Sequence, residues 1–319
     1  MGVDQHRIAA AASSCFASAP VQIGVAAVVV TRDRPALLRQ CLDAILMQDP
    51  PPARIVVVDN ASGPPTQAVI RGYPEVTCVS LPHNLGGAGG FRAGIQAGLA
   101  TGAEWLWLMD DDGRPAAADC LATLLDTAGR SGAELVGSLV VDVDAPDRLS
   151  FPIRLAGRTV FDVATVVRHG PVPGFAHLFN GALIAAGLFR RIGLPDPRFF
   201  IRGDEVEFLF RARRAGAGVV LATAAGFLHP GSAPEIHSIM GGRFYAVMPG
   251  TEMKQRCQFR NRGYIFRAYG MWGWLAADVV RYGWFFLIRQ RGDVRGLLRW
   301  AAATMRGVHG GFMRGPAPP

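Results

Sequence analysis

The residues best suited to chemistry in this sequence are three consecutive aspartates, Asp110, Asp111 and Asp112, which follow the apolar run WLWLM at residues 105–109. Adjacent carboxylates repel one another, so their charge has to be offset. Asp110 and Asp112, separated by one residue, can share a hard divalent cation that keeps open positions, as a diphosphate clamp requires. A solvated acidic turn before the next helix is the alternative, since Asp112-Gly113 is also a turn signal.

A glycine-rich stretch, NLGGAGGFRAG at residues 84–94, is the second candidate. Its glycines permit close approach of the backbone to a ligand at the start of a helix. The stretch does not fit the dinucleotide fingerprint, because Arg92 stands where the third glycine is required, and this disfavours a dehydrogenase. It also lacks the lysine of a Walker loop. On the residues alone, a packing turn remains the other interpretation.

The first half of the chain alternates strands and helices, and this alternation positions both candidates. Apolar runs predict strands at residues 25–30, 55–60, 76–81 and 105–109, with helices at 34–48 and after Gly86. This order predicts an α/β fold with a mostly parallel sheet and crossover helices, whose ligands bind beyond the carboxyl ends of the strands. The polar residues expected at that edge are Thr31, Arg32, Asp59, Asn60, His83, Asn84 and Asp110 to Asp112.

Composition limits the classes of protein. Half of the 319 residues are hydrophobic, enough for one large or two smaller domains. Five cysteines without CxxC spacing favour free thiols in a reducing compartment over disulfides. No run of about 18 apolar residues occurs, so we predict no membrane-spanning helix.

Charge and aromatic residues are concentrated at the C-terminal end. From Lys254 onward the net charge is +10, so the first 253 residues carry −2. Cationic, aromatic-rich composition suits an anionic membrane surface or nucleic acid, and ordinary helix packing is the third interpretation. Residues 274–290 predict an amphipathic helix, with one stripe formed by Leu275, Val279, Tyr282, Phe286 and Arg289.

The order of VVVT, VVVDN, NLGGAGG and MDDDG resembles the inverting family-2 glycosyltransferases of the GT-A fold. Further motifs resemble the galactofuranosyltransferases that initiate actinobacterial cell-wall galactan; they are HLFNGAL, FFIRGDEVEF, LHPGS, RNRGYIF and RYGWFFL. This resemblance covers residues 25–299. It implies a flexible tail at 1–22, a GT-A catalytic domain at 23–250, and a helical region at 251–319 that is associated with membrane and acceptor.

The resemblance also implies the roles of individual residues. A divalent cation, Mn²⁺ or Mg²⁺, is expected on Asp110, Asp112 and His229, and the catalytic base is expected at Glu205, with Asp204 as the alternative. Glu207 and, more weakly, His237 are candidates for acceptor binding, although an acidic helix start favoured by the helix dipole also accounts for Asp204 and Glu207. The donor is expected to contact Thr31, Arg32, Asp59, Asn84, Gly86, Gly87, Arg92, Asp110 and Asp111.

The function implied is metal-dependent, inverting transfer of galactofuranose from UDP-galactofuranose to a polyprenyl-diphosphate-linked rhamnosyl-GlcNAc acceptor at the cytoplasmic face of the plasma membrane. The enzyme is expected to be a peripheral membrane protein without a nucleic-acid partner, and its oligomeric state stays open. A rhamnosyltransferase, or another sugar transferase of the same family, is the alternative activity. A non-catalytic nucleotide-sugar or lipid-binding protein on the same scaffold is the alternative class.

Overall fold

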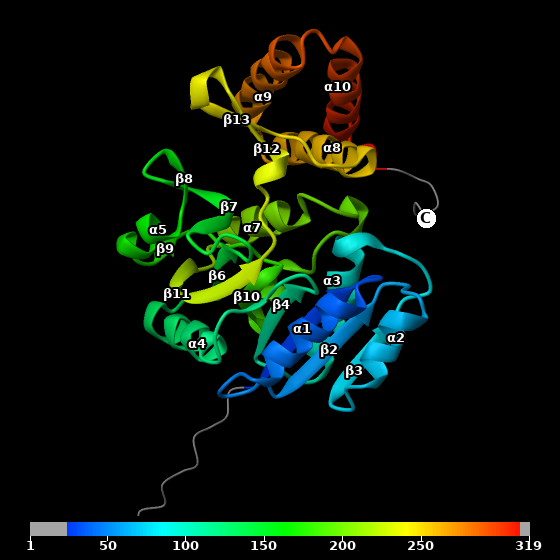
Figure 1. Cartoon of the computed structure of the whole chain (residues 1–319), viewed down its shortest axis with the longest axis vertical. Helices are drawn as coiled ribbons and strands as arrows, with labels where there is room; N and C mark the ends of the chain where they lie inside the picture. Colours follow the sequence, from blue (N-terminus) through cyan, green and yellow to red (C-terminus); the bar gives the residue numbers. More distant parts are fainter. Residues whose placement is uncertain (1–23, 313–319) are drawn as a thin grey trace, which may run out of the picture.

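A computed structural model describes residues 24–312 and has a mixed sheet at its centre (Figure 1). Four parallel strands form one side in the order β3-β2-β1-β4: β1 (Val25–Thr31), β2 (Arg54–Asp59), β3 (Val76–Ser80) and β4 (Trp105–Asp110). The predicted alternation of strands and helices is confirmed, with boundaries that differ by one or two residues at most positions.

The sheet continues through strands that sequence analysis did not assign. β10 (Asn180–Ala185) runs antiparallel to β4 and to β6 (Leu135–Asp142), and β11 (Val219–His229) runs parallel to β6. β11 therefore points in the same direction as β4. Its last residue, His229, reaches the edge of the sheet where β4 ends at Asp110.

Helices cover both faces because alternate side chains of each buried strand point to opposite sides. Ala27 and Val29 of β1 belong to one apolar cluster, and Val28 and Val30 belong to the other. The first face is covered by α1 (Pro35–Leu46), α2 (Pro64–Arg71) and α4 (Cys120–Ser131), and the second by α3 (Gly86–Ala100), α6 (Ala186–Ile192) and α7 (Asp204–Arg214).

Short elements extend the sheet and connect it to the C-terminal helices. Beside β6 and β11 lie β5 (Arg114–Pro115), β7 (Arg148–Leu155), β8 (Arg158–Asp162), α5 (Val163–His169) and β9 (Val172–Pro173). The turn η1 (Pro197–Phe199) precedes α7. After β11 come η2 (Ala233–Glu235), β12 (Ile236–Ile239), η3 (Met240–Gly242) and β13 (Phe244–Val247), with β12 and β13 forming a separate two-stranded sheet.

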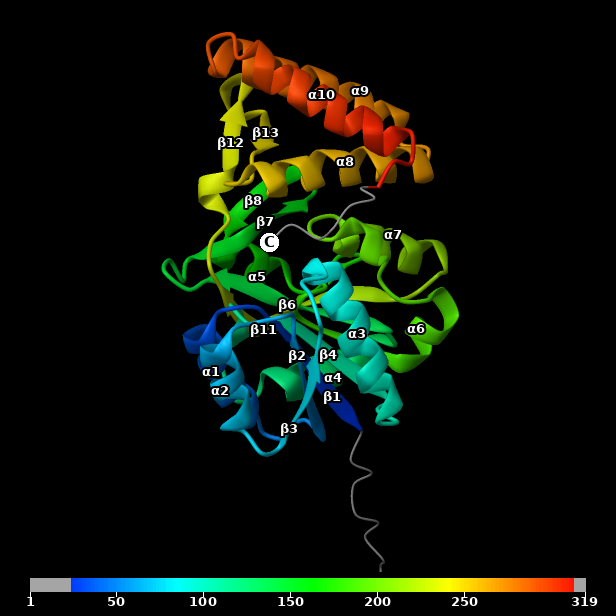
Figure 2. The ribbon, with the colours of Figure 1, turned by 90° about the vertical axis from the view of Figure 1, so that its right-hand side faces the viewer.

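The C-terminal helices form a layer across one end of the α/β part, as Figures 1 and 2 show. They are α8 (Glu252–Ala268), α9 (Trp272–Trp284), the π-helical turn η4 (Phe285–Arg289) and α10 (Val294–Val308). This layer has its own apolar core, which includes Phe259, Tyr282 and Trp300. No helix within residues 24–312 is both long enough and apolar enough to span a bilayer.

The predicted amphipathic stripe over residues 274–290 is wrong in part. Tyr282 and Phe286 are buried as expected, but Val279 is 54% exposed, and the buried face carries Asp278 instead. Asp278 is held by ion pairs with Arg262 and Arg281, and these satisfy its charge below the surface. The α-helix also ends at Trp284, where the π-helical turn shifts the face presented by the following residues.

Two further expectations concern the N-terminal tail and the cysteine thiols. The tail expected at residues 1–22 lies outside the described residues. Within the described part, the thiols of Cys41, Cys78, Cys120 and Cys257 are all free, in agreement with the expected absence of disulfides there.

Candidate functional site

The carboxyl edge of the sheet gathers the aspartates around one cation that sequence analysis missed, Arg34. Its guanidinium Nη1 donates to Asp111 Oδ1 at 3.1 Å and to Asp112 Oδ2 at 2.5 Å. The Thr31 hydroxyl donates to Asp111 Oδ2 at 2.6 Å. Arg34 directly precedes Pro35 at the start of α1, so the first crossover connection supplies the charge that offsets the aspartate repulsion.

The third aspartate also meets His229 from the end of β11. His229 Nε2 lies 3.4 Å from Asp112 Oδ1, and its Nδ1 lies 2.7 Å from the Pro230 carbonyl oxygen. A carbonyl only accepts, so Nδ1 donates there, and in the neutral ring Nε2 presents a lone pair toward Asp112. Asp112 Oδ1 is buried without a hydrogen-bond partner among the described residues. A proton or a metal cation between the two atoms satisfies both.

The ionisation of the aspartates follows from this arrangement. Burial raises the pKa of Asp112, but His229, when its ring is protonated and donates from Nε2, acts together with Arg34 to outweigh burial and lower that pKa to about 2. Burial raises the pKa of Asp111 to about 6 despite Thr31 and Arg34. Burial and then the neighbouring carboxylates raise the pKa of Asp110 well above its usual range. Asp112 is thus the carboxylate that stays ionised.

A carboxylate and an imidazole that face each other fit a divalent cation such as Mn²⁺, which accepts oxygen and imidazole ligands. The Nδ1 bond to a backbone carbonyl is the usual way in which proteins orient a metal-binding histidine. Within residues 24–312, no group of three His, Cys, Asp or Glu side chains is close enough to hold a metal together. The facing pair that fits is therefore Asp112 and His229, and the expected third ligand, Asp110, does not complete a group of three with them in the described residues.

The two candidate bases at the start of α7 differ in their surroundings. Asp204 is 3% exposed, and burial together with the charge of Glu205 raises its pKa to about 8. Burial also raises the pKa of Glu205, which the charges of Arg202 and His229 oppose. Glu205 is partly exposed whereas Asp204 is buried, so the accessibility of its side chain favours Glu205 over Asp204 as the group that faces a substrate.

The loop that leads into these carboxylates is conformationally strained. Phe200 and Arg202 have φ values of +66° and +67°, in the left-handed region that residues with a side chain rarely adopt. Asn261 of α8 is fully buried, and its amide donates to the carbonyls of Phe199, Ile201 and Arg202 at 3.0, 3.1 and 2.6 Å. We call residues 199–203 the base loop. A side chain of the C-terminal layer therefore holds the base loop in its strained form.

The base loop also touches the glycine-rich stretch. The Phe200 carbonyl accepts from the backbone amide of Ala88 at 3.1 Å, and a Cβ at Gly86 would lie 2.1 Å from that carbonyl oxygen. Gly86 has φ +69°, so it is required by the protein itself. A Cβ at Gly87 would meet no atom within 4 Å. Only Gly87 therefore leaves free space at the helix start where a donor group would approach.

Polar groups that follow or end the first three strands form the opposite side of the edge. Asp59 is 3% exposed and accepts from the Ser62 backbone amide at 2.8 Å. Asn84 Oδ1 accepts from the Gly86 amide at 2.8 Å. Arg32 Nε is buried without a hydrogen-bond partner among the described residues, and Arg32 forms only a 3.6 Å contact with Asp33. Asp59 and Asn84 thus shape the turns, while Arg32 retains a donor for a ligand.

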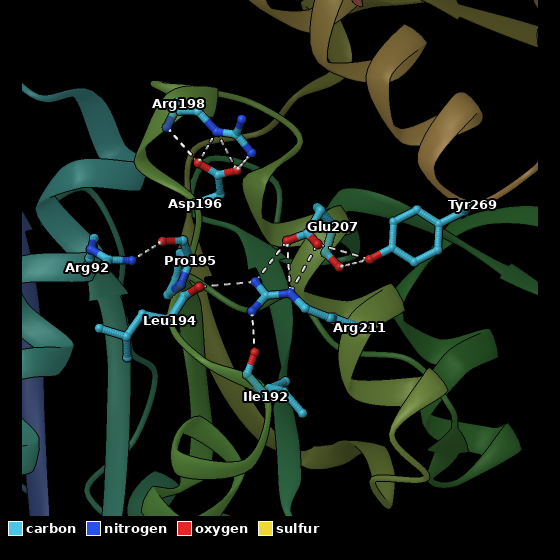
Figure 3. Close-up of polar contacts among 9 residues, drawn as sticks. All are labelled: Arg92, Ile192, Leu194, Pro195, Asp196, Arg198, Glu207, Arg211 and Tyr269. Atoms are coloured by element: carbon cyan, nitrogen blue, oxygen red, sulfur yellow. Dashed lines mark hydrogen bonds and ion pairs between the residues drawn. The ribbon is translucent and has the colours of Figure 1, made fainter. Parts of the chain in front are cut away.

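Three predicted residues are engaged elsewhere by protein groups. Arg92 donates to the Pro195 carbonyl at 3.4 Å, on the side of α3 that faces the loop before η1 (Figure 3). Glu207 is held by Arg211 at 2.8 Å and by the Tyr269 hydroxyl at 2.9 Å. His237 packs in the C-terminal layer, with its ring 5.3 Å from that of Phe285. None of the three makes a hydrogen bond to the aspartates or to His229 in the described structure.

Sequence analysis missed two further residues besides Arg34. Asn261 lies in the RNRGYIF motif, which contributes to the family resemblance but which sequence analysis gave no role. His177 lies in HLFNGAL; its buried Nε2 has no hydrogen-bond partner among the described residues, and burial lowers its pKa to about 4. The Phe151 ring lies 5.1 Å from His177 and 4.9 Å from His229. The sequence signal for Arg34 was an arginine directly before a helix-starting proline and just after the first predicted strand.

Comparisons with known proteins agree with this geometry. Residues 26–177 match the family model described as glycosyl transferase family 2. The chain is 40% identical to the galactofuranosyltransferase GlfT1 of Mycolicibacterium smegmatis over 297 residues, which cover 91% of this chain and 98% of that protein. It is 41% identical to GlfT1 of Mycobacterium tuberculosis over 282 residues, covering 86% and 92% of the two chains.

Solved structures show the same fold at low sequence identity. A fragment of TarS from S. aureus, residues 1–349, aligns with a TM-score of 0.54 and 13% identity, covering 91% of this chain and 83% of that one. The mannosyltransferase PcManGT from Pyrobaculum calidifontis, in complex with GDP-Man and Mn²⁺, aligns with a TM-score of 0.51 and 15% identity, covering 91% and 76%. The predicted GT-A fold with a helical C-terminal region is confirmed.

Proposed function

Because the chain belongs to glycosyl transferase family 2 and is a glycosyltransferase, we propose that it transfers galactofuranose from UDP-galactofuranose with inversion at the anomeric carbon. The identity to galactofuranosyltransferases over nearly the whole chain supports this donor. One structural observation carries the proposed chemistry: His229 Nε2 and Asp112 Oδ1 face each other at 3.4 Å at the strand edge.

In this proposal Glu205 is the general base. It accepts the proton of the acceptor hydroxyl while that oxygen bonds to the anomeric carbon. The bond from that carbon to UDP breaks, and UDP leaves with the electron pair. One displacement with one base inverts the configuration. Asp204, buried with a pKa near 8, is largely protonated at neutral pH and acts as a structural neighbour.

Asp112 and His229 would hold a divalent cation, Mn²⁺ or Mg²⁺. When bound, such a cation stabilises the negative charge of a departing diphosphate. Arg34 holds Asp111 and Asp112 in place from the other side. Thr31, Arg32 and the open face of Gly87 would meet the nucleotide sugar.

The proposed acceptor is a rhamnosyl-GlcNAc chain on a polyprenyl diphosphate, and the proposed location is the cytoplasmic face of the plasma membrane. The C-terminal layer supports this proposal because it exposes both large apolar side chains and arginines. Trp272, Val280, Ile288 and Leu298 are 53%, 60%, 61% and 63% exposed. Apolar groups flanked by cations suit the boundary between anionic headgroups and acyl chains.

A donor screen tests the proposal. The purified full-length chain is supplied with a lipid-linked acceptor, Mn²⁺ and one of three donors: UDP-galactofuranose, UDP-galactopyranose or dTDP-rhamnose. We expect UDP release and acceptor elongation with UDP-galactofuranose alone, and loss of both in EDTA. Elongation with dTDP-rhamnose would identify a rhamnosyltransferase, and full activity in EDTA would contradict the metal-dependent clamp. Binding of donor without turnover would indicate a binding protein.

A further inference from the structure

Strand β7 holds the segment of chain that begins with His229. The Ser150 hydroxyl donates to the His229 carbonyl oxygen at 2.7 Å. The Ser150 carbonyl oxygen in turn accepts from the backbone amide of Ser232 at 2.8 Å and from the Ser232 hydroxyl at 2.5 Å. Ser150 is 1% exposed, so these hydrogen bonds are shielded from water. One residue of β7 therefore fixes both ends of the segment from His229 to Ser232.

The next residue of β7 packs on the imidazole itself. The ring centroids of Phe151 and His229 are 4.9 Å apart, with an angle of 46° between the ring planes. This distance lies in the range in which aromatic rings attract one another. His229 Nδ1 also donates to the Pro230 carbonyl oxygen at 2.7 Å. Turning the imidazole would therefore break this hydrogen bond and change its packing against Phe151.

β7 is irregular at the two residues that make these contacts. It pairs with β6 at Leu149, and its register with β8 shifts between Arg148 and Ile153. Ser150 and Phe151 lie within that shift. In a regular strand successive side chains point to opposite faces, whereas a bulge redirects them. The irregularity therefore allows two consecutive residues to contact one histidine, the first at its backbone and the second at its ring.

The carboxylate that faces the imidazole is held in a comparable way. Arg34 binds Asp112 Oδ2, while Asp112 Oδ1 lies 3.4 Å from His229 Nε2. Each of the two facing side chains thus has a protein partner at its other polar atom. For Asp112 this partner is Arg34, and for His229 it is the Pro230 carbonyl. Such outer partners keep metal-binding side chains in a fixed orientation.

Ordinary packing is the competing explanation for these contacts. Phe151 also packs against the first apolar cluster of the sheet, and its ring lies 5.1 Å from that of His177. A hydroxyl bonded to a backbone carbonyl adds to stability wherever it occurs. Packing alone predicts that substitutions at Ser150 and Phe151 lower stability and leave the imidazole of the folded protein unchanged. The orientation of that imidazole therefore separates the two explanations.

We propose that Ser150 and Phe151 are positioning residues that hold the imidazole of His229 with its Nε2 facing Asp112. In this orientation the two side chains can share a divalent cation. This inference rests on the proposed function, which takes the pair to be a cation site. Ser150 fixes the backbone of His229, and Phe151 fixes the plane of its ring.

The first test measures the binding of Mn²⁺ to the full-length protein, through the loss of the electron paramagnetic resonance signal of free Mn²⁺. The variants are S150A and F151L. We expect the affinity to fall about 10–100-fold in each, which is the usual effect of removing a group that orients a metal ligand. H229A removes the ligand itself and shows the size of a complete loss.

Two matched controls lose the same kind of group elsewhere. S138A removes another buried serine hydroxyl, which donates to the Gly181 carbonyl at 2.7 Å. F175L removes another partly buried ring, which packs on His177 at 4.9 Å. Both should bind Mn²⁺ as the wild type does, at a temperature where thermal unfolding shows that every variant is folded.

The pattern across the variants decides between positioning and packing. Unchanged affinity in both S150A and F151L would overturn the proposal, and so would equal losses in S150A and S138A. If S150A does not fold, F151L and its control F175L decide the question, because they alter the ring contact alone. Mn²⁺ binding that is lost in H229A but unaffected by S150A and F151L would leave the proposed function standing and this inference wrong.

A second measurement needs no metal. Nitrogen NMR of the neutral histidine rings in EDTA shows which ring nitrogen carries the proton. In the wild type we expect the His229 proton on Nδ1, as its bond to Pro230 requires. F151L should give a mixture of the two tautomers and F175L should not; a wild-type spectrum of F151L would overturn the role of Phe151. If the wild type bound no Mn²⁺ while the tautomer still depended on Phe151, the proposed metal site would fail and the positioning of His229 would stand.

Discussion

At the scale of single residues, the site depends on neighbours that differ in burial. Asp204 and Glu205 are adjacent acidic residues at a helix start, yet burial leaves Asp204 with a pKa near 8, while Arg202 and His229 partly offset the rise at Glu205. In the same way, Asp112 remains ionised beside Asp110, whose pKa is raised. Acidic side chains one or two positions apart therefore differ in how readily they ionise.

Glu205→Gln should lower turnover by about 10²–10⁴-fold, because it removes proton acceptance and keeps the side-chain shape. UDP binding should be unchanged. Since the pKa of Glu205 is raised, wild-type turnover should rise with pH through a pKa above that of an ordinary glutamate, and the variant should lose this limb. The measurement is kcat against pH for both proteins. An inactive Asp204→Asn beside an active Glu205→Gln would move the base to Asp204.

Asp204→Asn should stabilise the fold more at pH 8 than at pH 5. The pKa of Asp204 is raised to about 8 in the folded protein, from an ordinary value near 3.8 in the unfolded chain. Between these values the folded protein holds a proton that the unfolded chain has lost, so wild-type stability falls as pH rises through this window. Asparagine removes that dependence. Denaturant unfolding in EDTA at pH 5 and pH 8 measures it, and the same change at both values would argue against a raised pKa.

At the scale of elements, most of the α/β part was predictable because its signals are local. Continuous apolar strands such as residues 25–30 and helical spacing in α1 identify the alternation, and parallel topology brings the strand ends together. The contact between Asp112 and His229 spans more than a hundred residues, and only the family resemblance indicated it. The buried face of α9 was mispredicted because Asp278 is satisfied by two arginines that no periodicity reveals.

The start of α3 offers a matched pair of substitutions. Gly87→Val should fold normally and lose UDP-galactofuranose binding, because a side chain there meets no protein atom and only a ligand would clash with it. Gly86→Val should destabilise the protein itself, since its Cβ would overlap the Phe200 carbonyl. Thermal unfolding and donor titration of both variants make the comparison. An unfolded Gly87→Val would mean that Gly87 is needed for packing.

The contact between α8 and the base loop gives a second prediction at this scale. Asn261→Ala removes the donor to three carbonyls of the base loop and should lower stability by about 1–3 kcal/mol. The relaxed loop should misplace Glu205, so that kcat falls much more than KM for the donor rises, at a temperature where the variant is fully folded. Gln258→Ala, on the same helix and without a hydrogen bond to the base loop in the described structure, is the control. Equal effects on kcat in the two variants would contradict a positioning role.

At the scale of the whole molecule, the C-terminal layer joins the chemistry to a surface. The segment from Lys254 onward carries a net charge of +10. Its described part exposes Trp272, Ile288 and Leu298. The same layer holds the base loop through Asn261. A face that suits a bilayer and a residue that sets the active-site loop therefore belong to one structural unit.

The variant R289Q/R291Q/R295Q/R299Q should lose binding to anionic liposomes, because each basic residue near such a surface contributes about 1 kcal/mol. Wild-type binding should weaken with added salt. Activity on a short water-soluble acceptor without the diphosphate should persist in the variant, while activity on the lipid-linked acceptor falls. Cosedimentation measures this binding with vesicles that lack phosphatidylglycerol and with vesicles of about 30% phosphatidylglycerol, which have a negative surface. Salt-independent binding to both vesicle types would exclude this electrostatic role.

The Phe200 carbonyl, shared by the start of α3 and the base loop, has a consequence for exchanging parts between related enzymes. Residue 86 must lack a Cβ to leave room for that carbonyl oxygen. Asn261 must be kept because it holds the loop to which the carbonyl belongs. A chimaera that takes residues 24–250 from this chain and the final helices from a relative without an asparagine at this position would break the second condition while keeping the first. Directed recombination should therefore take all three segments, the start of α3, the base loop and α8, from one parent.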